Sequence, residues 1–398
     1  MKNSVRNFFL LIFIFTATFS VAQSVNRNVI FTAVPFLTIT PDTRARGMGE
    51  NGVATSPDAN SIFWNTSKLA FAKKKFGAEV SYLPWMRSLV PDSYLSQVAL
   101  YVKPDSASGF TVSGRYFSGG EDFYYMPSGI IGQYKPREFA IDAGYTRRVA
   151  KDWSVGMNWK YIRSDIYNGI TISGIHTHPA QALAFDVSTF YNNNRIKISG
   201  VPCTMMIGAS ISNMGNRMTY IDSASRELLP ANLRIGQGFE FNFSPNHKLL
   251  FTYQANKLLV PTPPVYQLGT NGYPVVNPNT GQPVILSGKD PDVNVPLGMI
   301  QSFYDAPGGA KEEFKEINFQ LGLEYTYANS YIVRAGYSYE APEKGDRKFI
   351  SLGAGVRYNF AQLDFAYIIP VNGLRNPLRN TLQFSLVFEF DHFKRGKS

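Results

Sequence analysis

Few side chains of the types that bind metals or carry out nucleophilic catalysis occur in this sequence. The chain has four histidines and one cysteine, Cys203, so a disulfide framework and a cysteine-built metal site are both excluded. His176 and His178 form a His-x-His pair that could chelate a metal ion, but no carboxylate or third histidine stands nearby. Because zinc sites use three or four ligands, we expect a solvated loop pair here and no metal ion.

A glycine motif also suggests chemistry. Residues 47–52 read GMGENG and match G-x-G-x-x-G, the dinucleotide fingerprint. That fingerprint needs a strand before it and a helix after it, whereas Ser56-Pro57-Asp58 follows here and no strand–helix–strand unit surrounds it. We interpret the glycines as permitting a tight fold in a crowded interior and expect no cofactor. Spacings typical of serine hydrolases, zinc proteases and Walker A loops are also missing from the sequence.

Composition limits the fold class. The 398 residues are 44% hydrophobic, 14% aromatic and 17% charged, with a mean hydropathy of −0.14. Only the extreme N-terminus could form an apolar helix, which excludes a polytopic helical membrane protein. The 53 tyrosines and phenylalanines (23 and 30) argue against disorder. The 33 glycines and 24 prolines indicate many short strands and turns.

The first residues are typical of an export signal. Lys2 and Arg6 precede the apolar run 8–21, and Ser20-Val21-Ala22 supplies small residues for cleavage after Ala22. We therefore expect residues 1–22 to be a signal peptide. The alternative, a retained membrane anchor, fits less well because the run is short and wrongly flanked for a spanning helix.

The rest of the chain alternates between apolar and polar residues. In residues 153–161, for example, Trp153, Val155, Met157, Trp159 and Tyr161 alternate with Ser154, Gly156, Asn158 and Lys160. Fourteen such segments begin near Phe76, Ser96, Gly109, Glu138, Trp153, Leu183, Thr204, Asn232, His247, Ile317, Ser330, Phe349, Gln362 and Thr381. Most approach the ~9–11 residues that a tilted strand needs to cross a bilayer. The pattern predicts an all-β fold, a fourteen-stranded transmembrane β-barrel of the bacterial outer membrane, over residues 76–390.

The connections alternate between short and long. The long ones are 83–95, 118–137, 163–182, 213–231, 255–316, 339–348 and 370–380. Outer-membrane barrels have short periplasmic turns and long extracellular loops, so we expect both termini, including a tail at 391–398, in the periplasm. The short-side connection 192–203 is longer than the other short ones, and we expect part of it to extend the strands.

Two segments do not read as barrel wall. Residues 23–75 show little alternation, and we expect them to fold back as an N-terminal hatch in the lumen. Residues 255–316 form one extracellular loop with nine prolines, and we expect no strand pair in it. A loop of this length is usually functional or disordered.

The alternation leads to one prediction for the residues that face the lumen and another for the aromatic residues at the strand ends. Charged residues on the polar face should line a wet lumen, namely Asp142, Lys160, Arg234, Glu240, Glu324, Asp364 and Glu389. Aromatic residues at the short-side strand ends should form an interfacial girdle, namely Tyr101, Trp153, Tyr191, Tyr327, Tyr331, Tyr358 and Phe360. The alternative is a secreted β-sandwich, which would use shorter strands and would need no alternation in loop length.

Hydrolysis and nucleic-acid binding find little support. A hydrolase at the barrel wall would need a histidine on a lipid-facing strand position beside a serine, whereas His247 is expected in a turn and His392 beyond the last strand. The densest basic runs, at 73–75 and in the tail at 391–398, are short. They suit lipid phosphates or solvent at the membrane rim, and no nucleic-acid partner is expected.

Residues 43–65 carry a family resemblance. They read TRARGMGENGVATSPDANSIFWN and resemble the N-terminal signature of the PorV family, outer-membrane proteins of the type IX secretion system within the wider FadL superfamily. The resemblance implies a hatch followed by fourteen strands. The signature residues are Gly47, Met48, Gly49, Asp58, Ala59, Trp64 and Asn65. Two departures are Asn65-Thr66-Ser67 in place of Asn-Pro-Ala, and Arg46 where a glycine is common.

The resemblance also implies a role. PorV-like proteins bind the C-terminal signal domain of secreted cargo from a large outer-membrane translocon and deliver it to a sortase-like surface attachment complex. They are not expected to be enzymes, although lipopolysaccharide deacylation has been described for similar chains. FadL relatives instead pass hydrophobic small molecules through the lumen, which the charged inward set here disfavours.

The long loops are the expected partner-binding surface. We chose loops 83–95, 118–137 and 255–316, whose apolar and aromatic residues could hold an extended partner segment. The candidate contact residues are Trp85, Met86, Tyr124, Tyr125 and Tyr304. Basic loop residues such as Arg87, Arg137 and Arg163 could also contact lipopolysaccharide.

Overall fold

The structure is a computed structural model. It describes residues 27–87, 89–90, 92–120, 122–126, 129–167, 171–172, 175–221, 226–371, 378–379 and 381–391. The expected signal peptide 1–22, His392 and the tail beyond residue 391 lie outside these residues.

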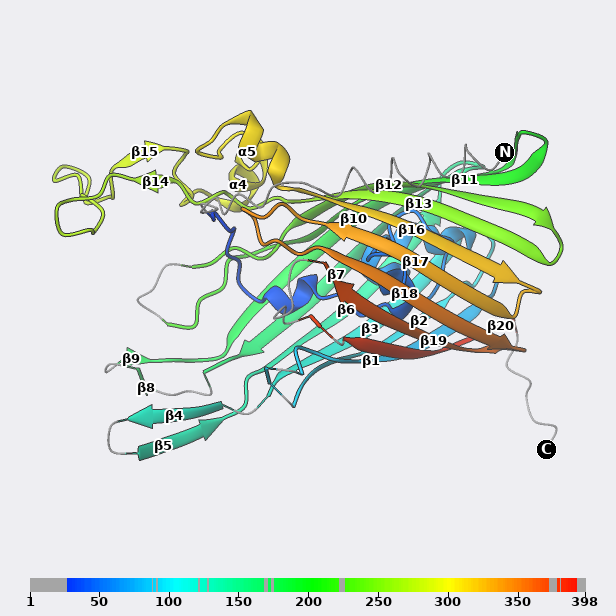
Figure 1. The fold of residues 1–398 in the computed structure, drawn as a ribbon, viewed down its shortest axis with the longest axis horizontal. Helices are drawn as coiled ribbons and strands as arrows, with labels where there is room; N and C mark the ends of the chain where they lie inside the picture. The colour runs from blue at the N-terminus through cyan, green and yellow to red at the C-terminus, as the bar shows by residue number, and fades with distance from the viewer. Residues whose placement is uncertain are drawn as a thin grey trace, which may run out of the picture.

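Fourteen antiparallel strands form a closed barrel (Figure 1). Each strand pairs with the next one along the wall, and the pairing of β1 with β20 closes the barrel. The wall strands are β1 (Phe76–Pro84), β2 (Ser93–Val102), β3 (Ser108–Gly119), β6 (Arg137–Arg148), β7 (Trp153–Asp165), β10 (Ala180–Ile198), β11 (Val201–Gly215), β12 (Asn232–Ser244), β13 (His247–Leu258), β16 (Ile317–Tyr327), β17 (Tyr331–Tyr339), β18 (Phe349–Tyr358), β19 (Ala361–Pro370) and β20 (Leu382–Phe390). Each begins within three residues of the start that the alternation predicts, so the predicted barrel is confirmed.

The two faces of the wall have opposite chemistry. In β7 the side chains of Val155, Met157 and Trp159 are exposed on the outside, whereas Asn158 and Lys160 are buried inside. The same alternation of exposed apolar and buried polar residues continues around the wall. A protein with an apolar outside and a polar inside suits lipid on its outer face, so this is a transmembrane barrel and the β-sandwich alternative is wrong.

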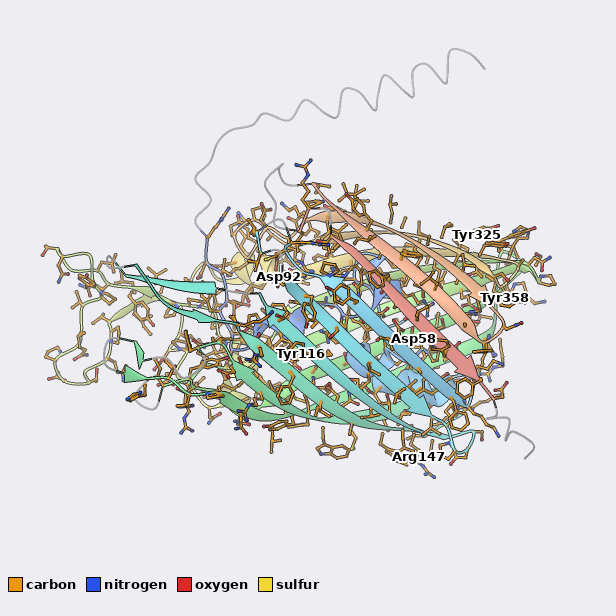
Figure 2. All side chains as sticks on the ribbon, turned by 90° about the horizontal axis from the view of Figure 1, so that it is seen from below. Asp58, Asp92, Tyr116, Arg147, Tyr325 and Tyr358 are labelled. Carbon is orange, nitrogen blue, oxygen red and sulfur yellow. The ribbon has the colours of Figure 1, made fainter. Side chains whose placement is uncertain are left out.

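The two ends of the barrel differ. Tyr325, Tyr358 and Arg147 gather at the end with the short turns (Figure 2). The other end carries three small two-stranded sheets outside the wall, formed by β4 (Asp122–Met126) with β5 (Gly129–Tyr134), β8 (Thr171–Ile172) with β9 (Ile175–His176), and β14 (Val265–Tyr266) with β15 (Ile285–Ser287). The helices α4 (Val295–Gln301) and α5 (Ala310–Lys315) lie there too.

The long loop corrects one expectation. Residues 255–316 were expected to hold no strand pair, but β14 and β15 pair within them. The prolines still keep this sheet small, with two and three residues per strand, and outside the wall. Among the described residues, no helix has the length and apolarity to span a membrane.

The short-turn end confirms one expectation and corrects another. Residues 192–198 and 201–203 lengthen β10 and β11, as expected of the long short-side connection. Trp153, Tyr327, Tyr331, Tyr358 and Phe360 are exposed on the outside, as a girdle requires. Tyr101 is different.

Tyr101 was expected in the girdle, but it is buried, and its hydroxyl donates to Glu389. It shares the inward parity of Gln97 and Ala99 in β2. A Cβ atom at Gly77 would lie 2.0 Å from the Tyr101 ring, so this glycine leaves the space that the ring occupies. Counting the alternation from Gln97 would have placed Tyr101 inside.

The N-terminal segment lies inside the barrel. It contains the 3-10 helices η1 (Pro35–Thr38) and η2 (Thr66–Phe71) and the short helices α2 (Thr43–Arg46) and α3 (Ser61–Trp64). Helix α2 contacts β18, β19 and β20, while η2 contacts β3, β6, β7 and β10 on the other side. Most residues from 33 to 72 are buried, so this segment fills the lumen between opposite walls.

Inward glycines let the backbone of this segment approach the wall. A Cβ atom at Gly336 in β17 would lie 2.0 Å from the Gly49 nitrogen, and one at Gly322 in β16 would lie 2.8 Å from the Met48 oxygen. Gly49 itself has a φ of 72°, a backbone conformation that glycine adopts without strain. The motif G-x-G-x-x-G therefore serves close packing in a crowded interior.

Candidate functional site

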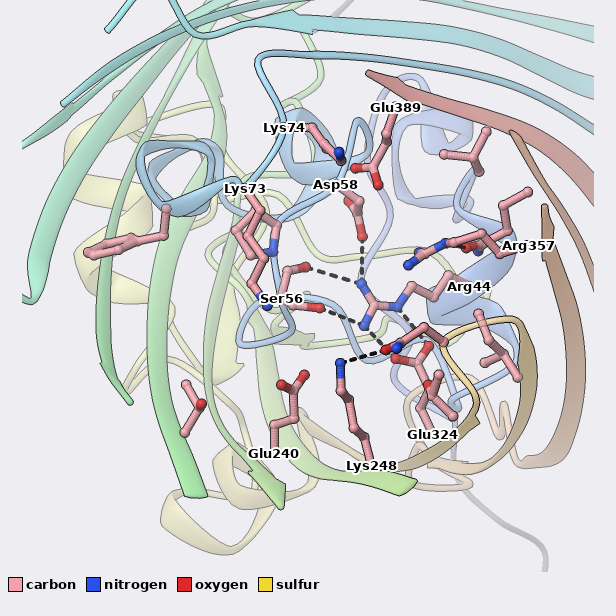
Figure 3. A pocket seen from close by; sticks show the side chains of 18 of the residues that line it. Arg44, Ser56, Asp58, Lys73, Lys74, Glu240, Lys248, Glu324, Arg357 and Glu389 are labelled. Atoms are coloured by element: carbon pink, nitrogen blue, oxygen red, sulfur yellow. Dashed lines mark hydrogen bonds and ion pairs between the residues drawn. The ribbon is translucent and has the colours of Figure 1, made fainter. Parts of the chain in front are cut away.

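Arg44 is the centre of a buried charge cluster (Figure 3). The Asp42 side chain caps α2 by accepting from the Ala45 amide at 3.0 Å, which fixes the start of the helix. Arg44 then projects into the lumen, where Nε and Nη2 donate to the two Glu324 carboxylate oxygens at 2.8 and 2.6 Å. Its Nη1 forms an ion pair with Asp58 at 3.0 Å. The contact between Arg44 and Glu324 is bidentate, with two parallel hydrogen bonds, which is the strongest geometry that an arginine and a carboxylate can adopt.

The charge cluster continues along the inner face of the wall, from one strand to the next. Glu324 in β16 also accepts from Arg334 in β17 at 2.7 Å. Arg334 in turn pairs with Asp364 in β19 at 2.6 Å. Alternating charges thus connect the N-terminal segment to three wall strands, and each buried charge has an opposite neighbour, as a low-dielectric interior requires.

A second set of contacts holds the far side of the segment. Lys68 is fully buried and donates to the Gly52 oxygen at 2.8 Å and to the Thr55 hydroxyl at 2.9 Å. Thr66 donates to Asn158 of β7 at 2.6 Å. Gln254 of β13 accepts from the amides of Gly52 and Val53 at 3.1 and 2.9 Å. The segment is therefore bound on opposite sides of the lumen.

The signature residues lie in this interior layer. Gly47, Met48 and Gly49 pack against β16, β17 and β18, and Asp58 pairs with Arg44. Trp64 donates its indole N–H to Asp42 at 2.8 Å. Asn65 donates to the Val53 and Thr189 oxygens at 3.1 and 3.0 Å, and Ala59 is buried. Their roles here are packing and hydrogen bonding.

A cavity of about 260 Å³ adjoins the Arg44 cluster. It lies toward the short-turn end, and its lining includes six basic and six acidic side chains. The basic ones are Arg44, Lys73, Lys74, Lys248, Arg334 and Arg357; the acidic ones are Asp58, Glu79, Glu240, Glu324, Asp364 and Glu389. A smaller cavity of about 130 Å³, lined in part by Glu50, Arg234 and Arg347, lies elsewhere in the lumen. Both suit water and polar groups more than an apolar ligand.

The inward charges match their prediction. Asp142, Lys160, Arg234, Glu324 and Asp364 are buried inside the wall. Glu240 and Glu389 line the larger cavity.

The predicted contact residues lie on three different loops at the long-loop end. Trp85 is partly buried against two apolar clusters, one containing Leu83 and Leu95 and the other Phe349, which leaves only part of its ring accessible. Met86 is half-buried, with a φ of 47°. Tyr124 and Tyr125 belong to β4, where they pair with Gly132 and Ile130.

Tyr304 is the most accessible of the predicted residues whose side chains are described. It follows α4, and half of its surface is exposed. The Lys289 ammonium lies 3.8 Å from the centre of its ring, which is cation–π geometry. The role of the five residues in binding a partner stays a prediction.

The histidines show one difference from expectation. His247 was expected in a turn, but it is the first residue of β13, on the outward face, where its Nδ1 lies 2.6 Å from the Tyr325 hydroxyl. Its ring also packs 5.1 Å from that of Tyr327. The partners of His247 are thus two tyrosines at the short-turn end, Tyr325 and the girdle residue Tyr327. Among the described residues, no group of three or more His, Cys, Asp or Glu side chains is placed to hold a metal ion.

Sequence reasoning missed the residues that hold the segment in place. Arg44 lies in the stretch that was expected inside the lumen, and Glu324 and Asp364 were expected to face it. A charge in such a stretch must find an opposite partner, so pairing the two sets was the available signal. Asn158 and Gln254 gave no signal beyond their inward parity.

The family follows from a comparison with protein-family models. The model described as "Type IX secretion system protein PorV" matches residues 22–265, more than half of the chain. The chain belongs to the PorV family. It is therefore placed among proteins of type IX secretion, and its fold is a closed fourteen-stranded barrel.

The solved structures that this PorV-family chain matches share little sequence with it. A FadL homologue of Pseudomonas aeruginosa is 13% identical, with a TM-score of 0.48 over 88% of this chain and 99% of that one. The toluene transporter TodX of Pseudomonas putida is 12% identical, with a TM-score of 0.48 over 88% and 99%. The toluene transporter TbuX of Ralstonia pickettii is 13% identical, with a TM-score of 0.46 over 89% and 98%. A search of curated proteins finds no match.

Proposed function

We propose that this PorV-family protein is a non-enzymatic outer-membrane component of the type IX secretion system. It binds the C-terminal signal domain of secreted cargo and carries it from the translocon to the sortase-like attachment complex at the surface. In this proposal the long loops are extracellular, both termini are periplasmic, and residues 23–75 act as a hatch. Family membership and the structure of the two barrel ends support the proposal.

The observation that carries the proposal is the arm formed within residues 259–294. Its sheet β14–β15 projects beyond the end of the wall (Figure 1). Leu268, Tyr273, Val276 and Leu286 are exposed on it. A two-stranded sheet has free backbone groups along its outer edges, and exposed apolar side chains beside them can hold alternate residues of an added strand. Such a surface suits an extended or β-rich partner.

The interior supports carriage outside the lumen. A transporter of hydrophobic small molecules would need an apolar route near the hatch, whereas both described luminal cavities are lined by charged groups. The segment that fills the lumen is bound to opposite walls, by Arg44 to Glu324 of β16 and by Thr66 to Asn158 of β7. The described interior therefore gives little support to the transporter alternative.

Deletion of the gene gives the first test. Cargo should accumulate in the periplasm with its C-terminal signal uncleaved, and normal attachment of cargo at the surface would contradict the proposal. Uptake of labelled fatty acid, measured in the same strain, should not change.

Variants of the arm sharpen this test. Leu268→Ser together with Leu286→Ser should leave the barrel folded, as judged by the heat-modifiable band on gels, but should retain cargo in the periplasm. The matched control is Phe314→Ser on α5, since Phe314 and Leu286 are each 64% exposed in the same loop. Equal secretion by both variants would count against the arm as the cargo contact.

A further inference from the structure

We propose that a niche on the outer wall holds one acyl chain of a membrane lipid. The niche lies between helix α4 and the outward faces of β7, β10 and β11, at the long-loop end of the barrel. Its lining residues include Trp159, Leu183, Phe185, Met214, Pro296 and Met299.

The floor of the niche belongs to the lipid-facing surface. Trp159, Leu183 and Phe185 point outward from β7 and β10, and 58%, 67% and 50% of their surfaces are exposed. In a transmembrane barrel, outward side chains such as these contact lipid tails. The niche is continuous with that surface, so its natural occupant comes from the bilayer.

The roof of the niche is built by specific contacts. Asn294 caps α4 by accepting from the Leu297 amide at 3.0 Å. Gln301, in the last turn, donates to the Asp290 oxygen at 2.8 Å. Arg217, just after β11, pairs with Asp292 at 2.8 Å and also donates to the Val293 oxygen. These contacts fix α4 beside the wall.

The chemistry of the niche selects a hydrocarbon chain. Its polar residue, Asn216, already accepts from the Leu183 amide at 2.8 Å and donates to the Arg217 oxygen at 3.1 Å. A hydrated headgroup would find few partners there, whereas a lipid tail would replace water along apolar walls on two sides. The exposed side chains of Leu297, Phe303 and Phe314 extend the apolar surface of α4 and α5. We expect this part of the loop to rest in the membrane interface.

Tryptophan quenching tests the proposal. Trp159 lines the niche, and Trp153 lies six positions earlier in β7, also exposed on the outside, which makes it the internal control. The purified full-length protein in detergent is titrated with phosphatidylcholine brominated on its acyl chains. Trp159→Phe and Trp153→Phe variants assign the signal to each ring. Quenching of Trp159 should saturate near one lipid per protein, while quenching of Trp153 should rise without saturation.

Two variants separate the niche from the surface around it. Met299→Ser with Ile300→Ser should weaken saturable quenching at least tenfold, because both side chains line the niche. Leu297→Ser, on the same helix but outside the lining, should leave it unchanged.

Two outcomes would overturn the proposal. Parallel quenching of both tryptophans would mean ordinary contact with surrounding lipid. Protection of Trp159 from bromine only when partner membrane proteins are retained would mean that a partner side chain occupies the niche. Cargo is not involved in these measurements, so they stand or fall separately from the proposed role in secretion.

Discussion

Arg44 donates to both carboxylate oxygens of Glu324, at 2.8 and 2.6 Å, although 280 positions separate the two residues. The contact joins the segment inside the lumen to the wall that surrounds it. Both side chains are largely shielded from water, with 14% and 9% exposure. The pair therefore connects the stability of the barrel to the order of its interior.

Arg44→Ala should destabilise the barrel. It leaves Asp58 without the Arg44 charge and Glu324 with only Arg334, and removing one partner of a buried ion pair typically costs about 3–5 kcal/mol. The temperature at which the heat-modifiable band disappears should fall, and amides of residues 44–68 should exchange faster. The control is Lys74→Ala, since the Lys74–Asp391 pair is 45% exposed on each side and should contribute under about 1 kcal/mol. Equal effects of the two changes would contradict this assignment.

Gly336→Ala should disturb the segment through sterics alone. The added methyl group would lie 2.0 Å from the Gly49 nitrogen and 2.1 Å from the Met48 carbonyl carbon, so the backbone must move. Such overpacking typically costs about 1–3 kcal/mol, measurable as a lower unfolding temperature. Gly114→Ala is the matched control, because nothing lies within 4 Å of its added Cβ. Unchanged stability of Gly336→Ala would show that the segment packs less closely than described.

Asp42 should make stability depend on pH. Burial, followed by the negative charge of Asp58, raises the pKa of Asp42 to about 6 from its ordinary 3.8. The folded protein then holds this proton more tightly than the unfolded chain, so the contribution is full below about pH 4 and is lost as pH rises through 6. Arg44 and Lys68 face the same carboxylate and oppose the shift.

Asp42→Asn should therefore flatten the dependence of unfolding temperature on pH between about 4 and 7. The single amide oxygen of the asparagine can replace one of the two carboxylate oxygens, which accept from Ala45 and Trp64, so one of these hydrogen bonds is kept and the fold should persist. Asp105 gives the opposite sign, because hydrogen bonds from the Ala107 and Ser108 amides lower its pKa in an exposed turn. Asp105→Asn should remove a small stabilisation that is present above pH 4. A steeper profile in Asp42→Asn would refute the assignment.

Glu316→Gln should loosen the base of the long loop. Its buried carboxylate accepts from Lys257 at 2.6 Å, Lys344 at 2.8 Å and the Thr262 hydroxyl at 2.7 Å. Losing a hydrogen bond to a charged group costs about 1.5–3 kcal/mol, so hydrogen exchange across residues 259–315 should speed up by one to two orders of magnitude.

The control for the loop is Glu343→Gln. The Lys315–Glu343 pair has the same chemistry, but its side chains are 40% and 29% exposed. Its loss should change exchange by less than about fivefold, since exposed pairs contribute under about 1 kcal/mol. If both substitutions had equal effects, the base of the loop would not depend on Glu316.

The wall could be predicted from the sequence because lipid on one face and a wet lumen on the other impose a strict period of two. That period places Trp159 outside and Lys160 inside without any knowledge of neighbours. The period also places Tyr101 inside, with Gln97 and Ala99; what failed there was the expectation that an aromatic residue at a strand end belongs to the girdle. The period gave no sign of β14 and β15, whose pairing inside a proline-rich loop spans only a few residues.

The interior was predictable only in outline. The signature around Gly47 indicated a segment in the lumen, but Arg44 and Glu324 meet only because the barrel closes between them. Contacts between residues this far apart depend on the whole topology, which no local pattern encodes. The arm with Leu268 and Leu286, and the niche beside α4, likewise arise from loops that carry no periodic signal.

The last wall strand contacts the N-terminal segment inside the barrel. Gln383 of β20 donates to the Pro41 oxygen at 2.5 Å, and β20 also completes the wall by pairing with β1. Assembly in the membrane must therefore enclose residues that were synthesised first, before the seam between the two terminal strands can join. A chain that lacks residues 23–75 would have no segment for the barrel to close around. We expect such a chain to insert slowly and to leave the seam between β1 and β20 open.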